Sequence, residues 1–182
     1  MRQIWFLLAL ALCGGAQAMS GVVTHVSDGD TLWVRPEGGR PVKVRLQGID
    51  APERCQPWGT QAQAALASRV LHRQVQVRTR AHDDYHRAIG TLELNGEDIA
   101  AWMVREGHAW SYRYRRSLGP YAEQEQQARA ARRGLFARPA VEPRAFRKSH
   151  GPCSAPLTTV NKALNRTGPV EVKETRSGPA FP

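Results

Sequence analysis

Four carboxylates stand in two short segments of the chain. Asp28 and Asp30 lie on either side of a glycine, and Asp50 and Glu53 are separated by an Ala-Pro pair. Carboxylates at close range repel one another, so the two pairs would need a cation if the fold brought them together. Their hard oxygens suit Ca²⁺ or Mg²⁺ better than Zn²⁺. Either pair alone is more typical of a turn, in which Asp and Gly are common, so the prediction of a site depends on both pairs meeting.

A hairpin predicted between the two pairs would bring them together. Residues 31–35 and 42–47 are predicted as strands, and in the second of them Val and Leu alternate with Lys, Arg and Gln. The two strands would run antiparallel across a turn centred near a glycine pair, so the start of the first lies beside the end of the second. Because Asp30 precedes the first strand and Asp50 follows the second, we expect an acidic cluster at one end of the sheet.

Arg45 is predicted on the polar face of the second of these strands. By the hairpin register it lies near Leu32, a few residues from the acidic end. A guanidinium fork grips phosphate oxygens with two hydrogen bonds and stabilises charge that develops in a transition state. The alternative is a surface cation, which is the usual place of an Arg on the outer face of a strand.

Three segments, taken in chain order, resemble the thermonuclease (staphylococcal-nuclease-like) family. They are Asp28-Gly29-Asp30-Thr31, then Arg45-Leu46-Gln47-Gly48-Ile49-Asp50-Ala51-Pro52-Glu53, and then Tyr85-His86-Arg87. The pair Gly134-Leu135, after a helix rich in Ala, Arg and Glu, is also similar to that family's last helix. The resemblance extends over residues 20–138, and the segment from Arg to Glu is its most specific part.

The resemblance implies an α+β fold, in which a five-stranded OB-type β-barrel is flanked by about three α-helices. It also implies a Ca²⁺ cofactor. The cation would be held by Asp30, Asp50 and the backbone carbonyl of Ala51, with Asp28 nearby and acting through water. Ala51 stands where the best-known member of the family has Thr, which matters little if only the carbonyl binds metal.

The resemblance further implies a nuclease that hydrolyses phosphodiester bonds of DNA and RNA. Glu53 would be the general base, and Arg45 and Arg87 would clamp the scissile phosphate. Water would attack phosphorus and the 5′-oxygen would leave, which gives 3′-phosphate ends. His86 stands where a Gly is common in the family, and this departure bears on the turn that presents Arg87.

Three tyrosines are candidates for contacts with the substrate: Tyr85, Tyr112 and Tyr114. The segment 110–116 interleaves aromatic side chains with arginines, as surfaces that bind single strands do. The alternative is that these aromatics pack beneath the helices. His82 and His86 are spaced like a metal pair, but without a suitable third ligand a solvated loop is the better interpretation.

The remaining elements follow from periodicity and turn signals. Strands are predicted at 21–26, 74–79 and 88–94. A helix with a capping-box pattern formed by Thr60 and Gln63 follows the strand at 42–47, which is the third in chain order. Asp98 would cap a second helix that stops at Gly107, and Pro120 would open a third, which ends before Gly134. Five strands with a helix after the third fit a small closed barrel.

The two ends of the chain differ from the predicted domain at 19–138. Residues 1–18 resemble a signal peptide cut after Ala18, because an apolar run too short to span a bilayer precedes a small-x-small site. A buried N-terminal strand is the alternative. We therefore expect the protein to be exported from the cytoplasm and to be periplasmic or secreted. Residues 139–182 hold seven of the 12 prolines and are predicted to be a largely disordered tail.

Removal of the leader would also remove Cys13 and leave Cys55 and Cys153. In an oxidising compartment these two either pair, which would tie the tail to the active-site loop, or remain separate thiols. The basic run at 144–148 either adds nonspecific affinity for DNA or only improves solubility.

The formal charge of +10 favours a polyanionic partner. We expect a monomer that acts on DNA and RNA, mainly on single or accessible strands, with no stable protein partner and no membrane association after cleavage of the leader. A barrel that binds nucleic acid without cutting it is the main alternative, and a basic cell-wall or membrane-surface protein is a third. The first alternative is disfavoured because degenerate domains lose some of the key residues, and this chain keeps five: Asp30, Arg45, Asp50, Glu53 and Arg87.

Overall fold

The computed structural model describes residues 18–151 and 153, and it contains a closed β-barrel. The barrel strands are β1 (Ala18–Val26), β2 (Thr31–Pro36), β3 (Val42–Leu46), β5 (Gln74–His82) and β6 (Ala88–Leu94). Neighbours in the order β3-β2-β1-β5-β6 pair antiparallel, and a parallel pairing between β3 and β6 closes the barrel. The predicted five-stranded OB-type barrel of an α+β protein is confirmed.

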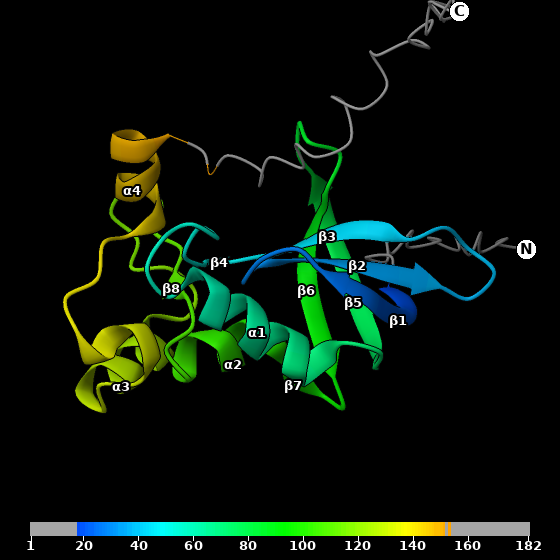
Figure 1. Cartoon of the computed structure of the whole chain (residues 1–182). Helices are drawn as coiled ribbons and strands as arrows, with labels where there is room; N and C mark the ends of the chain where they lie inside the picture. The colour runs from blue at the N-terminus through cyan, green and yellow to red at the C-terminus, as the bar shows by residue number, and fades with distance from the viewer. Residues whose placement is uncertain (1–17, 152, 154–182) are drawn as a thin grey trace, which may run out of the picture.

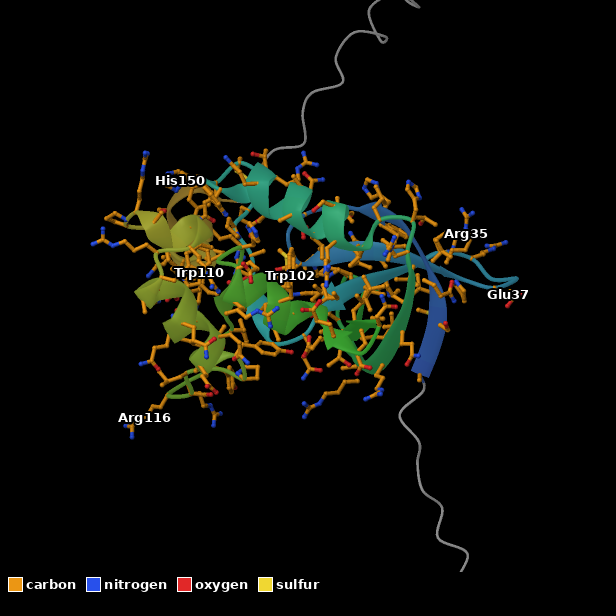
Figure 2. All side chains as sticks on the ribbon, turned by 90° about the horizontal axis from the view of Figure 1, so that it is seen from below. Arg35, Glu37, Trp102, Trp110, Arg116 and His150 are labelled. Atoms are coloured by element: carbon orange, nitrogen blue, oxygen red, sulfur yellow. A yellow bond between two sulfur atoms is a disulfide. The ribbon has the colours of Figure 1, made fainter. Side chains whose placement is uncertain are left out.

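Short strands and helices complete the described part of the chain (Figure 1). The strand β7 (Glu97–Asp98) extends the sheet beyond β6, while β4 (Ile49–Asp50) pairs with β8 (Trp110–Ser111). Residues 18–151 contain four α-helices, one more than expected: α1 (Gly59–Val70), α2 (Ile99–Arg105), α3 (Ala122–Ala130) and α4 (Pro143–His150). A 3₁₀ helix, η1, spans Gly134–Ala137. In Figures 1 and 2, α1 and α2 lie between the barrel and the pair α3 and α4, and the β2–β3 hairpin with Arg35 and Glu37 lies at the opposite end from His150.

The hydrophobic core forms because the strands alternate and the helices carry apolar residues at helical spacing. On β6, for example, every second residue from Ala88 to Leu94 is buried. The helix α1 buries one face against the barrel through Ala62, Leu66 and Val70, and α2 buries Ile99 and Met103. No helix in the described ranges is both long and apolar enough to cross a bilayer.

The N-termini of α1 and α2 are stabilised in different ways. Asp98 caps α2 as predicted, since its carboxylate accepts from the backbone N–H groups of Ala100 and Ala101 at 2.9 and 3.2 Å. The capping box predicted for α1 is wrong. That helix begins two residues earlier than a Thr60 cap would place it, after Trp58 in a left-handed conformation, and Gln63 donates instead to the carbonyl of Val26 at 3.0 Å. The Gln63 side chain therefore joins helix to barrel rather than closing the helix end.

A helix also forms where a disordered tail was expected. Residues 143–150 make α4, on which Pro143 and Phe146 are buried. A disulfide joins Cys55 to Cys153, so the pairing alternative of the two cysteines is the one found. The prediction of disorder is wrong for this segment, because a covalent bond supplies the fixation that its weakly apolar sequence lacks. Residues 1–17 and 154–182, which hold the predicted leader and the end of the tail, lie outside the described residues.

One glycine sets the path of the chain into the acidic segment. Gly48 adopts φ +80°, and a Cβ there would lie 2.6 Å from the ring of Pro120. Only glycine suits both the left-handed conformation and this close approach. The chain then enters β4, in which Asp50 pairs with Trp110 of β8. The Asp50 backbone is therefore fixed to the helical side of the molecule.

Candidate active site

The hairpin of β2 and β3 brings the acidic segments together at one end of the barrel. Thr31 pairs with Arg45, which places Arg45 one residue nearer the acidic end than its predicted neighbour Leu32. The backbone N–H of Leu46 donates to the carbonyl of Asp30 at 2.8 Å. The N–H of Ala51 donates to Asp30 Oδ2 at 3.2 Å, so the two acidic segments are directly bonded.

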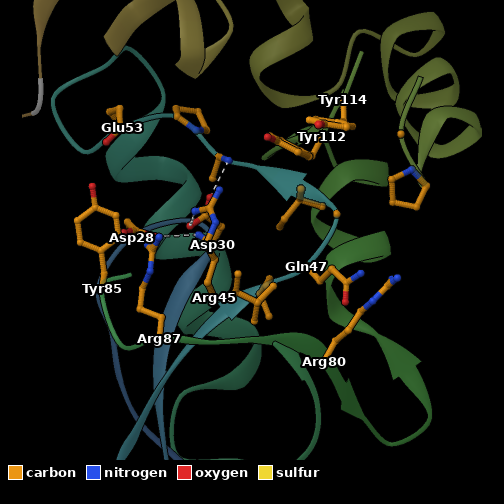
Figure 3. Close-up of a pocket in the computed structure, with 18 of the residues that line it drawn as sticks. Asp28, Asp30, Arg45, Gln47, Glu53, Arg80, Tyr85, Arg87, Tyr112 and Tyr114 are labelled. Carbon is orange, nitrogen blue, oxygen red and sulfur yellow. Dashed lines mark hydrogen bonds and ion pairs between the residues drawn. The ribbon is translucent and has the colours of Figure 1, made fainter. Parts of the chain in front are cut away.

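Arg45 pairs with the two most buried carboxylates of the cluster, Asp30 and Asp50, and Figure 3 shows it beside Asp30. Its Nη1 is 2.5 Å from Asp30 Oδ1, and its Nη2 is 3.3 Å from Asp50 Oδ1. Asp30 and Asp50 are only 4% and 6% exposed. Burial of a charged carboxylate costs free energy unless a cation and hydrogen bonds offset the loss of water. Arg45 supplies part of this offset for Asp30 and Asp50. The interpretation of Arg45 as an ordinary surface cation is therefore wrong.

Burial and crowding change the acid strengths in the cluster. Burial and then the charge of Asp30 raise the pKa of Asp28 to about 7. Burial also raises the pKa of Asp50 above its ordinary value, although the charges of Arg147 and Arg45 oppose this. Burial alone would lower the pKa of Arg45, but the charges of Asp30 and Asp50 raise it above its ordinary value, so this guanidinium stays charged.

The carboxylates open into a cleft with a volume of about 1020 Å³. Its lining includes Asp28, Asp30, Ala51 and Glu53 as well as Arg45 and Arg87. The three tyrosines proposed for substrate contact also line it, and Figure 3 shows Tyr85 on one side of the carboxylates and Tyr112 and Tyr114 on the other. All three are exposed, at 77%, 44% and 62%, so they do not pack beneath the helices.

Arg87 is held by a turn rather than by the acidic cluster. Its Nε donates to Asp83 Oδ2 at 2.7 Å, and its backbone N–H donates to Asp83 Oδ1 at 2.9 Å. Arg87 also lies over the ring of Tyr85, 5.3 Å from its centroid. His86 takes φ 57° in this turn, the left-handed region in which glycine is favoured. The turn thus forms with a histidine at this position and still directs Arg87 into the cleft.

The acidic cluster is suited to a hard cation by its charge. Arg45 and Arg147 pair with three of the four carboxylates, Asp30, Asp50 and Glu53, so the carboxylates outnumber the guanidinium groups that contact them, and every donor is an oxygen. No group of three or more His, Cys, Asp or Glu side chains within the described ranges is arranged to hold one ion, and this also applies to the loop with His82 and His86. A cation would therefore use Asp30 and Asp50 together with backbone or water oxygens.

Sequence reasoning missed one site residue, Arg147 of α4. Its Nη1 is 2.6 Å from Glu53 Oε1, and its Nη2 is 3.3 Å from Asp50 Oδ2. The basic run at 144–148 was the available signal, but only the pairing of Cys55 with Cys153 reveals which of its members faces the cleft.

An OB-type barrel that carries clustered carboxylates and arginines in a cleft with tyrosines has the arrangement of a hydrolase acting on nucleic acid. The family of staphylococcal nuclease homologues matches residues 43–138. The chain is 40% identical to Protein ParB of Escherichia coli over 161 residues, which cover 81% of this chain and 90% of that protein. It is 37% identical to Micrococcal nuclease of Shigella flexneri over 141 residues, or 71% and 80% of the two chains. An uncharacterized endonuclease of Haemophilus influenzae is 32% identical over 127 residues, or 69% and 71%. The chain belongs to the staphylococcal nuclease family, and its class is that of a nuclease-type hydrolase.

Proposed function

We propose that this protein is an exported, Ca²⁺-dependent nuclease that hydrolyses phosphodiester bonds of DNA and RNA. The observation that carries the proposal is the joint placement of Asp30, Glu53 and Arg45 in one open cleft, with Asp50 paired to the same Arg45. Family membership and the relatives named as nucleases support the same reaction class. A module that only binds nucleic acid would have no need for buried carboxylates that repel one another and their anionic ligand.

Each side chain of the cleft has a defined part in the proposed reaction. Glu53 accepts a proton from the attacking water and holds it in line with phosphorus. Arg45 and Arg87 hydrogen-bond the phosphate oxygens and stabilise the charge that builds on them. Asp30, Asp50 and the Ala51 carbonyl hold the Ca²⁺, with Asp28 acting through water. When bound, the ion polarises a phosphoryl oxygen and favours ionisation of a water molecule. Departure of the 5′-oxygen leaves a 3′-phosphate.

The exposed tyrosines support a preference for single or accessible strands. Tyr85, Tyr112 and Tyr114 lie beside the acidic centre with exposed rings, and an arginine lies over one face of the Tyr85 and Tyr114 rings. Stacking on such rings requires unpaired bases, and it tolerates any base because each has a π-face. We therefore propose that denatured DNA and single-stranded RNA are cut faster than duplex DNA, by a protein that acts as a monomer.

Export is proposed from the leader-like residues 1–18. Cleavage after Ala18 would leave β1 intact from Met19, which pairs with Val77. The disulfide between Cys55 and Cys153 is consistent with an oxidising compartment, the periplasm or the medium.

Digestion of heat-denatured DNA tests the proposal directly. The purified protein is assayed in Ca²⁺ and in chelator beside an Asp50→Ala variant. Cleavage is expected only for the unmodified protein in Ca²⁺, and the 3′-phosphate ends of the products should block extension by a DNA polymerase until a phosphatase removes the phosphate. Salt-sensitive retention of DNA without cleavage would instead establish a binding module.

A further inference from the structure

Arg147 reaches into the acidic centre from a helix that lies outside the barrel. It forms ion pairs with both Glu53 and Asp50, and its side chain remains 40% exposed in the cleft. Asp50 Oδ1 lies 3.3 Å from Arg45 Nη2 and 3.4 Å from Arg147 Nη1. Two guanidinium groups from different segments thus converge on one carboxylate oxygen.

We propose that Arg147 is a further phosphate-binding residue of this nuclease, and that the Cys55–Cys153 disulfide holds it in the site. The proposal rests on the nuclease function put forward above, because it assigns Arg147 to the phosphate of the same substrate. It adds a third cation to Arg45 and Arg87, supplied by α4 rather than by the barrel.

The positions of the arginines favour this role. The hydrogen bonds of Arg147 to Asp50 and Glu53 use three of the five N–H donors of its guanidinium, so donors remain for a phosphate oxygen, whereas the Nε of Arg87 is bonded to Asp83. A phosphodiester that approaches four carboxylates is repelled, and each guanidinium beside them reduces that repulsion. Two forks on one centre can also bond two oxygens of the same phosphate, which a single fork cannot hold as firmly.

The cleft remains open with α4 in place. Its volume of about 1020 Å³ is measured with Arg147 among the lining residues, and Tyr112, Tyr114 and Glu53 line the same space. The helix therefore forms part of the wall and does not close the entrance, which favours a contact with substrate over a plug that excludes it.

Burial of Pro143 and Phe146, together with polar and covalent contacts, holds α4 in this position. Cys153 follows the helix and is bonded to Cys55, Gln56 Nε2 donates to the carbonyl of Val141 at 2.6 Å, and Arg113 pairs with Glu142. A helix of eight residues is marginal in water by itself, so its order depends on such attachments. Among these attachments the disulfide is covalent, and it joins the segment after α4 to the loop that carries Glu53.

The first test measures binding without catalysis. Affinity for a fluorescent single-stranded oligonucleotide is determined in chelator, over a range of salt, for the unmodified protein and for Arg147→Ala. We expect about a tenfold loss of affinity in the variant, as for a hydrogen bond to a charged group. The slope of log affinity against log salt should fall by about 0.7, which corresponds to one phosphate contact on a single strand. Lys148→Ala is the matched control, because it removes one charge from the same helix outside the cleft and should change affinity less than about threefold.

The second test measures cleavage in Ca²⁺. Arg147→Ala is expected to lower kcat/KM by about a hundredfold, comparable to the loss of one donor to the transition state. The double substitution Cys55→Ser/Cys153→Ser should reproduce most of that loss. Added to Arg147→Ala, the double substitution should cause no further loss, since both changes remove the same contact. Thermal unfolding of every variant checks that the barrel is intact.

Equal or tighter binding and equal or faster cleavage by Arg147→Ala would overturn the proposal for Arg147. Full activity of the serine variant would overturn the part assigned to the disulfide. Failure of the unmodified protein to cleave in Ca²⁺ would refute the nuclease function itself, and the binding comparison in chelator would still decide whether Arg147 contacts the phosphate.

Discussion

The raised pKa of Asp28 predicts that the isosteric change Asp28→Asn stabilises the metal-free protein, and that the gain grows with pH. In the folded protein, burial and the charge of Asp30 raise the pKa of Asp28 from 3.8 to about 7. Because the folded-state pKa is the higher one, the stability from this group is fully present below the unfolded pKa and is lost as pH rises through about 7. The asparagine has no charge to bury and keeps an oxygen that can accept from the Asp30 N–H, a bond of 3.0 Å in the native protein.

The size of the effect follows from the two pKa values. Each pH unit between them costs about 1.4 kcal/mol, so the penalty is about 4 kcal/mol above pH 7 and about 2 kcal/mol near pH 5. The advantage of Asp28→Asn should therefore increase by about 2–3 kcal/mol between about pH 5 and about pH 8. Structural differences that do not involve protons cancel in this comparison, because they are the same at both pH values.

Urea unfolding in chelator, followed by circular dichroism at both pH values, measures this difference. Asp84→Asn is the control, since that carboxylate is exposed in a nearby loop and should give no pH-dependent difference. Equal stability changes at the two pH values for Asp28→Asn would refute the reasoning, because they would mean that Asp28 is ionised over the whole range.

Three further predictions address the site and its surroundings. Glu53→Gln should reduce kcat in Ca²⁺ by about 10²–10⁴-fold while the melting temperature stays unchanged; turnover near that of the unmodified protein would remove Glu53 from the mechanism. His86→Gly should raise the free energy of unfolding by about 0.5–1 kcal/mol, because glycine accepts the left-handed φ of 57° without strain; a lower urea midpoint would contradict this. Truncation after Ala140 should leave a barrel that unfolds cooperatively but cleaves as slowly as Arg147→Ala, and loss of the cooperative transition would make α4 part of the folding unit.

Much of the barrel could be predicted because its signals are local. The alternation of Val42, Val44 and Leu46 fixed the face of β3, and the hairpin then set Arg45 within one residue of its observed partner. The acidic cluster followed from the same register. The N-terminus of α2 was predictable for a similar reason, since Asp98 bonds to N–H groups only two and three residues away.

The errors arose where tertiary contacts decide the outcome. Gln63 matches a capping pattern, but the nearby carbonyl of Val26 is its partner in the folded chain. Arg147 could not be placed, because its position depends on a bond between cysteines that are 98 residues apart in the sequence. Spacing alone gives no preference among the basic residues of the segment 144–148.

The parallel pairing of β3 with β6 has a consequence for how activity is lost. This pairing, called the seam below, joins Val44 to Ala88. Arg45 follows Val44 on β3 and Arg87 precedes Ala88, so both arginines lie next to the same residue pair of the seam. Parting of the seam would separate these two arginines while the antiparallel pairings of the other strands persist. Local opening requires less free energy than global unfolding, so the seam can part while most of the chain is still folded. The seam thereby couples closure of the barrel to assembly of the phosphate clamp, and enzymatic inactivation on gentle heating should precede the loss of secondary structure.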